Sequence, residues 1–469
     1  MEPYLTATVT LVHVLAAARV TGHALLTKAD SRAAVAWIGL AWLSPLIGSA
    51  IYAVFGVNRV ARKATKLRQQ YTPDHATPES GRGGVPNVPG NLGRLAAVGR
   101  EVTGRRLTTG NHVEVLERGA DAKRSMLTAV ENAEQSVALA SYIFQADAVG
   151  RAFVEALSRA HDRGVAVRVL IDGVGGGYLT YPILRRLRRH RVPTATFLHS
   201  WRPWRMPFVN MRNHKKLLII DGTYAFTGGM NIADHTMDYR PRVMDTHIRL
   251  RGPVVRHLMQ AFADDWNFTT GESLSQGCWW PALERADSIA ARAVTSGPDE
   301  DMGALETMLG AAIVEARESI RIVTPYFLPD RHLQMALSLA ALRGVMVDII
   351  IPARSNKRLI DWASRANLQF LTGEAWRVFL TPPPFDHSKL MTVDGSFCLV
   401  GSSNWDARSH RLNFELDVEA YDRDLTAKID EAIDLRVARS QQTGRRELAQ
   451  RPLSRQIRDA AARLLLPYL

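Results

Sequence analysis

Cysteine is almost absent from the chain, with only Cys278 and Cys398 among 469 residues. Two cysteines argue against a disulfide framework, and their scarcity agrees with a domain that folds in the cytoplasm. Cys398 lies in an apolar, strand-like run, so we expect it to be buried. Dense clusters of Asp, Glu or Cys are also missing, so the sequence offers no signature of a metal site.

Acidic residues are outnumbered: 46 Asp and Glu face 59 Lys and Arg, which gives a formal net charge of +13. This excess of positive charge makes nucleic acid and anionic lipid the two candidate classes of partner. The N-terminus, Met1-Glu2-Pro3, lacks the basic start that a secretory signal peptide has.

The N-terminal region is unlike a soluble protein. Residues 33–55 are apolar and nearly uncharged, interrupted only by Ser44 and Pro45. At about 1.5 Å per residue, ~23 residues of helix reach about 34 Å, enough to cross a bilayer. Residues 5–26 are a weaker candidate because they contain Arg19 and two histidines. Together the two segments, joined by a short polar link, predict a transmembrane hairpin within residues 1–56. Such a hairpin favours lipid over nucleic acid as the partner.

A basic run follows the second apolar segment: Arg59, Arg62, Lys63, Lys66 and Arg68. The positive-inside tendency predicts that this flank is cytoplasmic, which places the catalytic lobes on the cytoplasmic side of the membrane. The short link between the apolar segments carries a weaker competing signal. Residues 57–110 therefore read as a basic flank and a Pro/Gly-rich linker.

Two stretches of the chain share one pattern. Residues 214–221 and 387–394 both read H-x-K-x4-D, and each is followed by a small-residue turn and an asparagine, Asn231 or Asn404. The interval from Asp to Asn is ten residues in both copies (231 − 221 and 404 − 394). A lone H-x-K indicates an ordinary histidine, whereas two matched copies indicate a duplicated unit whose halves meet at one site.

The residue types of the paired pattern suit attack on a phosphodiester. Side chains alternate along a strand, so His214 and Lys216 share one face, as do His387 and Lys389. Two imidazoles, two ammonium groups and two asparagine amides would then occupy one pocket. A neutral imidazole can attack phosphorus, and the second imidazole can move the proton. The lysines and asparagines can hold the phosphate oxygens, and no cofactor or metal is required.

The aspartate that ends each pattern has a different role. Asp221 and Asp394 precede glycine between two apolar runs, which predicts the turn of a β-hairpin. Asx-type hydrogen bonding within the turn accounts for both residues. We therefore interpret them as structural supports of the catalytic pattern and not as proton carriers.

The repeat extends beyond these motifs. Residues 138–144 parallel residues 321–327, and the Arg-Gly-Val of residues 163–165 returns at residues 343–345. Helical patterns between the strand-like runs end at Arg-Gly, a basic residue followed by a breaker. Strand–helix–strand alternation predicts α/β lobes whose mixed sheets are flanked by helices.

We place a first lobe at residues 111–295, a second at 296–440, and a basic amphipathic helix at 441–469. The helix has two candidate positions, a membrane surface or the second lobe. A segment rich in Trp and Arg, between Leu198 and Met211, has two readings as well: a headgroup-binding loop or a loop packed on the first lobe.

With its paired HKD motifs the chain resembles the phospholipase D superfamily and, within it, the bacterial cardiolipin synthases. The resemblance runs from about Gly119 to Asp424 and includes the apolar hairpin. It is carried by several blocks in order: residues 212–214, 228–234, 324–330, 404–409 and 412–415. It implies two pseudo-symmetric phospholipase D-like lobes that form one active site.

The family also implies roles for single residues. By analogy His214 is the nucleophile and His387 the acid/base. Lys216, Lys389, Asn231 and Asn404 carry over as phosphate ligands. Glu415 and Asp245 resemble the acidic residues that orient the histidines, at 11 and 14 residues after the motif asparagines. The hydroxyl of Ser402 has two readings, a phosphate contact or a bond within the turn.

The function that the resemblance implies is phosphatidyl transfer: two phosphatidylglycerols would give cardiolipin and glycerol through a phosphohistidine. A membrane-bound phospholipase D hydrolase, or a transferase with another donor such as phosphatidylethanolamine, would use the same residues. A nuclease is disfavoured by the hairpin and by the lack of aromatic stacking platforms. A non-catalytic scaffold is disfavoured by the intact double motif, and a homo-oligomer remains open.

Overall fold

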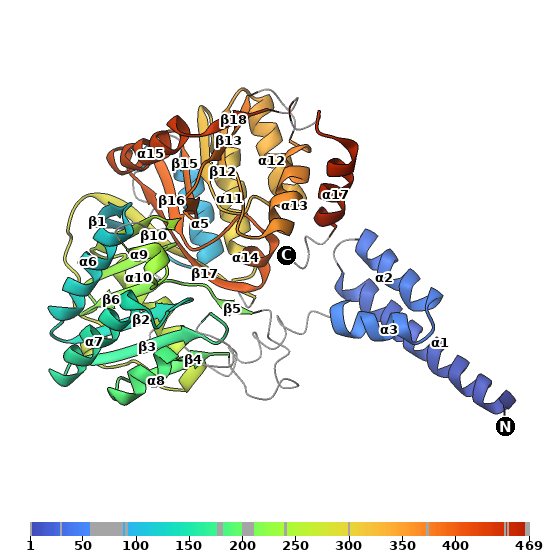
Figure 1. The fold of residues 1–469 in the computed structure, drawn as a ribbon, viewed down its shortest axis with the longest axis horizontal. Helices are drawn as coiled ribbons and strands as arrows, with labels where there is room; N and C mark the ends of the chain where they lie inside the picture. The colour runs from blue at the N-terminus through green and yellow to red at the C-terminus, as the bar shows by residue number, and fades with distance from the viewer. Residues whose placement is uncertain are drawn as a thin grey trace. The chain divides into compact units, whose positions relative to one another are not determined.

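The computed structural model of the chain describes residues 2–28, 31–56, 88–89, 92–175, 182–198, 211–238, 242–298, 301–371, 375–444, 447 and 450–464 (Figure 1). The chain divides into two compact units, residues 1–66 and 67–469. The basic run after the second apolar segment, most of the Pro/Gly-rich linker and the Trp/Arg-rich segment lie outside the described residues.

The N-terminal unit consists of apolar helices. Among the described residues, α1 (Glu2–Thr27) is the one helix long and apolar enough to cross a membrane. α2 (Ser31–Leu43) stops before Pro45, Leu46 turns to a φ of 56°, and α3 (Ile47–Ile51) continues into the π-helical turn η1 (Tyr52–Gly56). Proline ends α2 because its ring excludes the helical conformation of the preceding residue. The prediction of one continuous span over residues 33–55 is therefore wrong, and the segment ranked weaker forms the long helix.

Small side chains let the helices of this unit approach each other closely. Its core is Ala17, Val20 and Ala24 of α1 against Ala41 and Tyr52. Trp37 and Ile38 of α2 pack against this core. Many other large apolar side chains of α1 and α2, such as Leu15, Leu26 and Leu43, are exposed, which suits a lipid environment.

A mixed sheet organises the larger unit, and its two halves repeat each other. β1 (Thr108–Leu116) and β10 (Ile289–Ser296) meet antiparallel in the middle. From β1 the first half runs β9 (His247–Arg251), β7 (Tyr224–Gly228), β6 (Leu217–Ile220), β2 (Ser136–Ser141), β3 (Ala166–Asp172) and β4 (Thr194–Phe197). From β10 the second half runs β17 (Asn413–Tyr421), β16 (Phe397–Gly401), β15 (Leu390–Val393), β11 (Ser319–Val323), β12 (Met346–Pro352) and β13 (Trp376–Thr381), with β18 (Gln441–Thr443) at its edge. The order confirms two pseudo-symmetric lobes.

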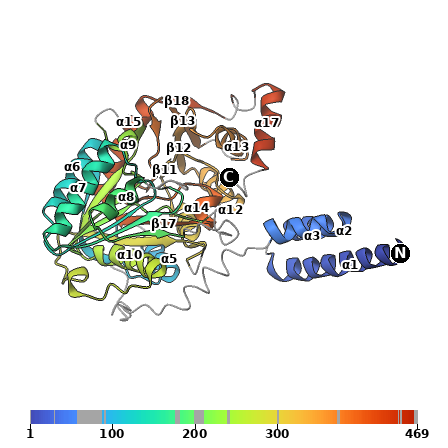
Figure 2. The same ribbon diagram turned by 60° about the horizontal axis from the view of Figure 1, so that its bottom comes forward.

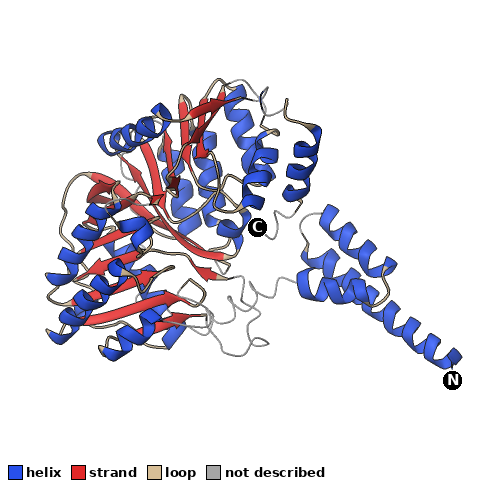
Figure 3. Cartoon of the chain, viewed as in Figure 1, coloured by secondary structure: helices blue, strands red, loops and turns tan. Residues whose placement is uncertain are grey.

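Helices cover the sheet in both lobes (Figures 2 and 3). In the first lobe, α6 (Gly119–Glu131), α7 (Ala148–Asp162) and α8 (Pro182–Arg189) share one apolar core with the strands, and α10 (Val255–Thr270) packs on β4 and β6. In the second lobe, the core holds α5 (Gly93–Thr103), α11 (Ala304–Glu315) and α12 (Arg331–Leu342), with α13 (Arg358–Leu368) and α15 (Arg423–Ala438) beside it.

The matching helices α7 and α12 begin and end alike. Asp147 caps α7 and Asp330 caps α12, each accepting a hydrogen bond from a backbone N–H three residues later. Both helices end at Arg-Gly, where Gly164 and Gly344 have a φ of 90° that only glycine adopts readily. The sequence expectation of a helix end at each Arg-Gly is confirmed.

The predicted boundaries shift at three places. β10 is the counterpart of β1, so the second lobe begins near Ile289 instead of residue 296. The segment expected to be linker ends in α5, whose Leu95 and Ala96 lie in the core of the second lobe. Residues 441–469 do not form one helix: β18 is followed by α17 (Leu453–Arg463), which docks on α13.

α17 docks with only part of its apolar side chains buried. Asp459 and Ala462 are buried, and the Arg458 guanidinium lies 4.4 Å from the centre of the Trp362 ring. Leu453 and Ile457 face outward. The helix thus takes the docked position while keeping an exposed apolar face. Elsewhere, Cys398 is buried in β16, as expected.

Candidate active site

Two very short parallel ladders bring the lobes together at the site. β5 (Arg212–Asn213) pairs with the first residues of β17, and β14 (Phe385–Asp386) pairs with β8 (Val243–Met244). Each ladder crosses from one lobe to the other, and each ends just before a motif histidine on one strand and an acidic residue on its partner. The backbone N–H of His214 donates to Phe414 O at 2.9 Å, and that of His387 donates to Met244 O at 2.7 Å.

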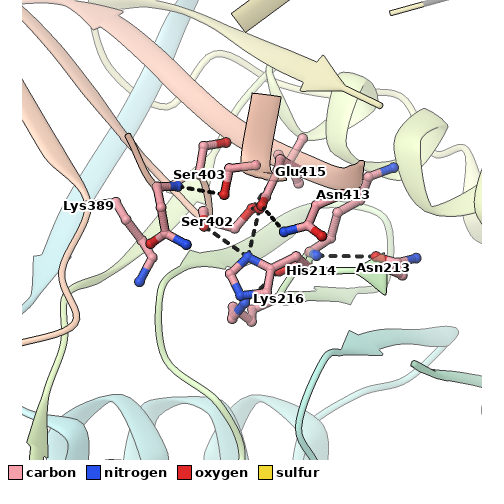
Figure 4. A network of polar contacts seen from close by, with 12 residues as sticks. Asn213, His214, Lys216, Lys389, Ser402, Ser403, Asn413 and Glu415 are labelled. Atoms are coloured by element: carbon pink, nitrogen blue, oxygen red, sulfur yellow. Dashed lines mark hydrogen bonds and ion pairs between the residues drawn. The ribbon is translucent and has the colours of Figure 1, made fainter. Parts of the chain in front are cut away.

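Each motif histidine is therefore held by a carboxylate of the opposite lobe, and Figure 4 shows the pair of His214 and Glu415. Nδ1 of His214 lies 2.8 Å from Oε2 of Glu415, and Nδ1 of His387 lies 2.8 Å from Oδ2 of Asp245. His214, Glu415 and Asp245 are buried, and 13% of the His387 side chain is exposed. With Nδ1 occupied in both rings, the Nε2 atoms remain to face a substrate.

Asp245 and Glu415 occupy equivalent positions although their sequence spacings differ. Gly228 of β7 pairs with His247 of β9, and Gly401 of β16 pairs with Asp417 of β17. Counting back two residues from each partner gives Asp245 and Glu415. The sheet register thus matches the two acids across the repeat, which the differing spacing in the sequence concealed.

The surroundings of His214 fix the position of its ring proton. Besides Glu415, Nδ1 lies 3.0 Å from the backbone carbonyl oxygen of Ser402. Both neighbours accept hydrogen bonds, so Nδ1 carries the hydrogen and Nε2 carries the lone pair. Burial lowers the pKa of His214 to about 4 against the opposing pull of Glu415, which keeps the ring neutral at physiological pH.

Glu415 itself is firmly ionised. Burial opposes its charge, but His214 and Lys216, together with a 2.6 Å hydrogen bond from Ser402 Oγ, outweigh burial and lower the pKa of Glu415 to about 2. Nδ2 of Asn413 donates to its other oxygen at 3.0 Å. Ser402 is fully buried, and its hydroxyl also accepts a 3.0 Å hydrogen bond from the N–H of Leu416. The hydroxyl thus supports Glu415.

His387 has a more divided environment. Its Nδ1 lies 2.8 Å from Asp245 Oδ2 and 2.8 Å from the ammonium nitrogen of Lys389. An acceptor and a donor thus compete for the same ring nitrogen. Burial, reinforced by Lys389, lowers the pKa of His387 to about 4. Burial also opposes the charge of Asp245, but Lys389 and His387 outweigh it and hold the pKa of Asp245 below its ordinary value.

The two motif lysines lie beneath the histidines and not on the cavity wall. Nζ of Lys216 donates to the backbone oxygen of His214 at 2.5 Å, and Nζ of Lys389 donates to that of His387. Burial lowers the pKa of Lys216 to about 7 and that of Lys389 to about 8. The expectation that both ammonium groups would line one pocket is therefore not met in this structure.

A cavity of about 230 Å³ opens over the histidines. His214, His387, Asn231 and Asn404 all line it, so the structure brings together four of the predicted residues from both lobes. Oδ1 of Asn231 accepts a 3.3 Å hydrogen bond from the N–H of Ile143. Oδ1 of Asn404 is buried without a hydrogen-bond partner among the described residues.

The two motif aspartates lie away from the cavity and hold the sheets. The carboxylate of Asp221 accepts hydrogen bonds from the backbone N–H groups of residues 134, 135 and 136, at 2.7–3.2 Å. That of Asp394 accepts from residues 317, 318 and 319, at 2.8–2.9 Å. Both aspartates sit in the expected hairpin turns with a φ near 50° (51° and 49°). Their carboxylates tie the hairpin to the start of β2 or β11, instead of bonding within the turn.

Several cavity residues lie outside the predicted set. The ring of Tyr142 meets that of His214 edge-on at 4.8 Å, and Arg212, Arg408 and Lys357 line the same cavity. Arg212 and Arg408 stand in blocks that carry the family resemblance, and their nearness to the motifs was the available signal. Lys357 lies far from both motifs in sequence, and no local pattern marks it.

Buried charge pairs brace the segments that carry the histidines. Lys215 Nζ lies 2.9 Å from both carboxylate oxygens of Asp265, which also accepts from Asn213 at 2.8 Å. Arg436 donates to Asp386 at 2.7 Å, directly before the second histidine. Among the described residues, no group of three or more His, Cys, Asp or Glu side chains is placed to hold a metal ion.

A family model described as "Cardiolipin synthase, PLD-like domain" matches residues 126–266 and 309–435, more than half of the chain. The chain belongs to this family. A cardiolipin synthase of Geobacillus sp. (strain WCH70) is 32% identical over 93% of this chain and 88% of its own length. The major cardiolipin synthase ClsA of Bacillus subtilis (strain 168) is 33% identical over 77% of this chain and 76% of its own length.

The fold of this cardiolipin synthase family member also occurs in a solved structure. Phosphatidylserine synthase of Haemophilus influenzae Rd KW20 superimposes with a TM-score of 0.63 at 16% identity, covering 80% of this chain and all (100%) of that one. The shared fold agrees with the paired lobes of the sheet.

Proposed function

We propose that the protein is a phosphatidyltransferase that condenses two phosphatidylglycerols into cardiolipin and glycerol. The observation that carries the proposal is the crossed pairing of His214 with Glu415 and His387 with Asp245. It gives one cavity a neutral imidazole with its lone pair at Nε2 and a second imidazole opposite to it. The membership of the chain in the cardiolipin synthase family supports the choice of substrate.

In the first step Nε2 of His214 attacks the phosphorus of the donor lipid. A P–N bond forms, the P–O bond to glycerol breaks, and His387 gives its proton to the leaving oxygen. Glu415 stabilises the positive charge that develops on His214. The anionic phosphate beside His387 favours the protonated form of that ring, against the opposing effects of burial and of Lys389.

In the second step the terminal hydroxyl of another phosphatidylglycerol attacks the same phosphorus. His387 takes the hydroxyl proton, the new P–O bond forms, and the P–N bond to His214 breaks. The amides of Asn231 and Asn404 hold the non-bridging oxygens in both steps. Lys216 and Lys389 act from beneath the histidines, where their charge stabilises the phosphate at short range.

Nδ1 contacts support the assignment of the nucleophile. The hydrogen on Nδ1 of His214 faces two acceptors, so the nucleophilic tautomer is fixed. Nδ1 of His387 faces one acceptor and one donor, an arrangement that suits a ring whose proton must come and go.

The test is an assay of the detergent-solubilised protein with labelled phosphatidylglycerol, alongside His214→Ala. Cardiolipin and glycerol in equal amounts, both lost in the variant, support the proposal. Phosphatidic acid as the main product favours the alternative, a membrane-bound phospholipase D hydrolase, since water then resolves the intermediate. Turnover only with phosphatidylethanolamine would mean that this lipid is the donor, while the two-step transfer through His214 would stand.

We further propose that the protein is an inner-membrane protein whose catalytic lobes face the cytoplasm. The length and apolar surface of α1, the relation to bacterial cardiolipin synthases and the basic run after the second apolar segment support this location. A second crossing would require α2 and α3 to act together. Labelling of single cysteines placed before α1 and in the lobes of intact cells tests both points.

A further inference from the structure

The cavity is symmetric in its motifs but not in its charge. Arg212 lies two residues before His214, and the equivalent residue before His387 is Phe385. Arg408 lies four residues after Asn404, and the equivalent residue after Asn231 is His235. All four of these non-motif residues line the cavity. At related positions, one side therefore presents two guanidinium groups and the other a phenyl ring and an imidazole.

A third cation extends the basic side. Lys357 follows β12 and lines the same cavity, with its ammonium nitrogen 5.6 Å from the centre of the Tyr326 ring. The ring of Tyr326 lies 6.3 Å from that of His387. Burial, and after it the charge of Arg212, lowers the pKa of Arg408, so the cations lie close enough to repel each other. Burial raises the pKa of Tyr142, and the charges of Arg212 and Arg408 oppose that rise, so both guanidinium groups lie near this ring. The basic side therefore reaches from Tyr142, beside His214, to the neighbourhood of His387.

Nearby carboxylates do not cancel this charge. Asp172 accepts hydrogen bonds from the backbone N–H groups of residues 174, 175 and 213, and burial raises its pKa. Asp406 caps α14 (Ala407–Arg411) by accepting from the N–H of Ser409, and burial raises its pKa to about 6. Two carboxylates with raised pKa values face three cations, so the side has a net positive charge that suits an anion.

The proposed reaction contains one anion that the motif residues do not hold. The donor lipid brings a single phosphate, which lies at His214, Asn231 and Asn404 while it reacts. The released glycerol is neutral. The second phosphate enters with the acceptor lipid, whose hydroxyl must reach His387 while its own phosphodiester stays in the cavity. Water and simple alcohols bring no such charge.

We propose that Arg212, Arg408 and Lys357 form an anion subsite that holds the phosphodiester of the acceptor lipid. The proposal rests on the proposed function and names the residues that select a lipid acceptor over water. Guanidinium groups match phosphate with paired, charge-assisted hydrogen bonds, so they anchor the acceptor headgroup beside the phosphohistidine. The hydroxyl oxygen then bonds to phosphorus, the P–N bond to His214 breaks, and the proton passes to His387.

The test measures how one donor is divided among acceptors. Wild type, Arg408→Gln and Arg212→Gln turn over labelled phosphatidylglycerol in mixed micelles with and without 1-butanol, and cardiolipin, phosphatidylbutanol and phosphatidic acid are resolved. We expect each variant to lower the cardiolipin rate about 10- to 100-fold, the range of a lost charged hydrogen bond. Transfer to butanol and water should fall less than about threefold, so phosphatidic acid becomes the main product without butanol.

Arg411→Gln is the matched control, because Arg411 is exposed on the same helix as Arg408 and does not line the cavity. It should keep the wild-type product ratio. Arg408→Lys should recover part of the cardiolipin rate, since it restores the charge. Retained transfer to butanol shows that the variants are folded.

Three results would overturn the subsite. An unchanged product ratio in both glutamine variants means that the two arginines do not bind the acceptor lipid. An equal loss with all three acceptors means that the cations serve the donor or the fold. A loss matched by Arg411→Gln means a general effect of surface charge. Failure of the proposed function looks different, because the wild type itself would then form no cardiolipin.

Discussion

Replacing Glu415 by glutamine asks whether a carboxylate from the second lobe activates the nucleophile of the first. Glutamine keeps the shape of the side chain and removes its charge. Glu415 is buried, and its pKa of about 2 means that wild type carries the charge at every working pH. The substitution therefore separates the electrostatic contribution from packing.

The expected loss follows from the contact with His214. Glu415 Oε2 lies 2.8 Å from Nδ1, and positive charge develops on the ring as Nε2 attacks phosphorus. A buried hydrogen bond to a charged group contributes about 1.5–3 kcal/mol, which at about 1.36 kcal/mol per tenfold is a rate loss of about 10- to 150-fold. The amide also turns one NH2 group toward Ser402 or Asn413, which both donate to this carboxylate. A small loss of thermal stability should accompany the loss of rate.

The assay is the rate of glycerol release in the first turnover, measured with enzyme in excess over donor, which reports the first step alone. Glu431→Gln is the matched control, since Glu431 is exposed on α15. Thermal unfolding of both variants monitors the fold. A Glu415→Gln protein that is folded and releases glycerol within twofold of the wild-type rate would refute the role of the carboxylate.

Three further outcomes are expected. Asp394→Ala should lower the free energy of unfolding by about 2–4 kcal/mol in urea titrations, because three backbone N–H groups lose their acceptor; an unchanged midpoint contradicts this. Lys216→Met should abolish activity yet raise stability at pH 7. The pKa of Lys216 in the folded protein, about 7, lies below its unfolded value, so the charge of Lys216 destabilises the folded state most fully below pH 7. Thermal scans should therefore show that the stability gained by the methionine variant shrinks as pH rises from 7 toward 10. The first step should show no loss of rate as pH falls through 6.5 and should lose its rate near pH 4, where His214 becomes protonated; a rate of glycerol release that falls on the acid side of an inflection near 6.5 would contradict this.

Local patterns in the sequence sufficed for the strands, hairpins and paired helices. The runs at residues 217–220 and 390–393 form β6 and β15, each turning at Asp-Gly into the next strand. These features depend on the alternation of apolar residues and on breakers, which act over a few residues. The double motif also predicted that both histidines lie in one site.

What the sequence concealed depends on contacts between distant residues. The intervals from motif asparagine to acid differ, and only the sheet register shows that Asp245 and Glu415 are equivalent. Which acid serves which histidine follows from the crossed ladders of β5 and β8, each two residues long. The partners of Asp221 lie more than eighty residues earlier in the chain (85–87).

Pro45 already indicated that residues 33–55 would not form one helix, but the high hydropathy of this segment favoured a single span. A proline inside an apolar stretch ends the helix before it, and α2 stops at Leu43. The first segment has polar residues, but the one proline of α1, Pro3, lies in its first turn, where proline is tolerated. Continuity of the helix, more than mean hydropathy, decided which segment is long enough to span a membrane.

The measurement that most directly tests the account is identification of the residue that carries the phosphatidyl group. His387→Ala should be mixed with phosphatidyl-p-nitrophenol, whose leaving group needs no proton, and quenched in alkali before peptide mass spectrometry. The first step then proceeds while the second lacks its base, so the account predicts a phosphatidyl group accumulating on His214. A label on another residue, or release of nitrophenol with no labelled peptide in a variant that turns over only once, would contradict it.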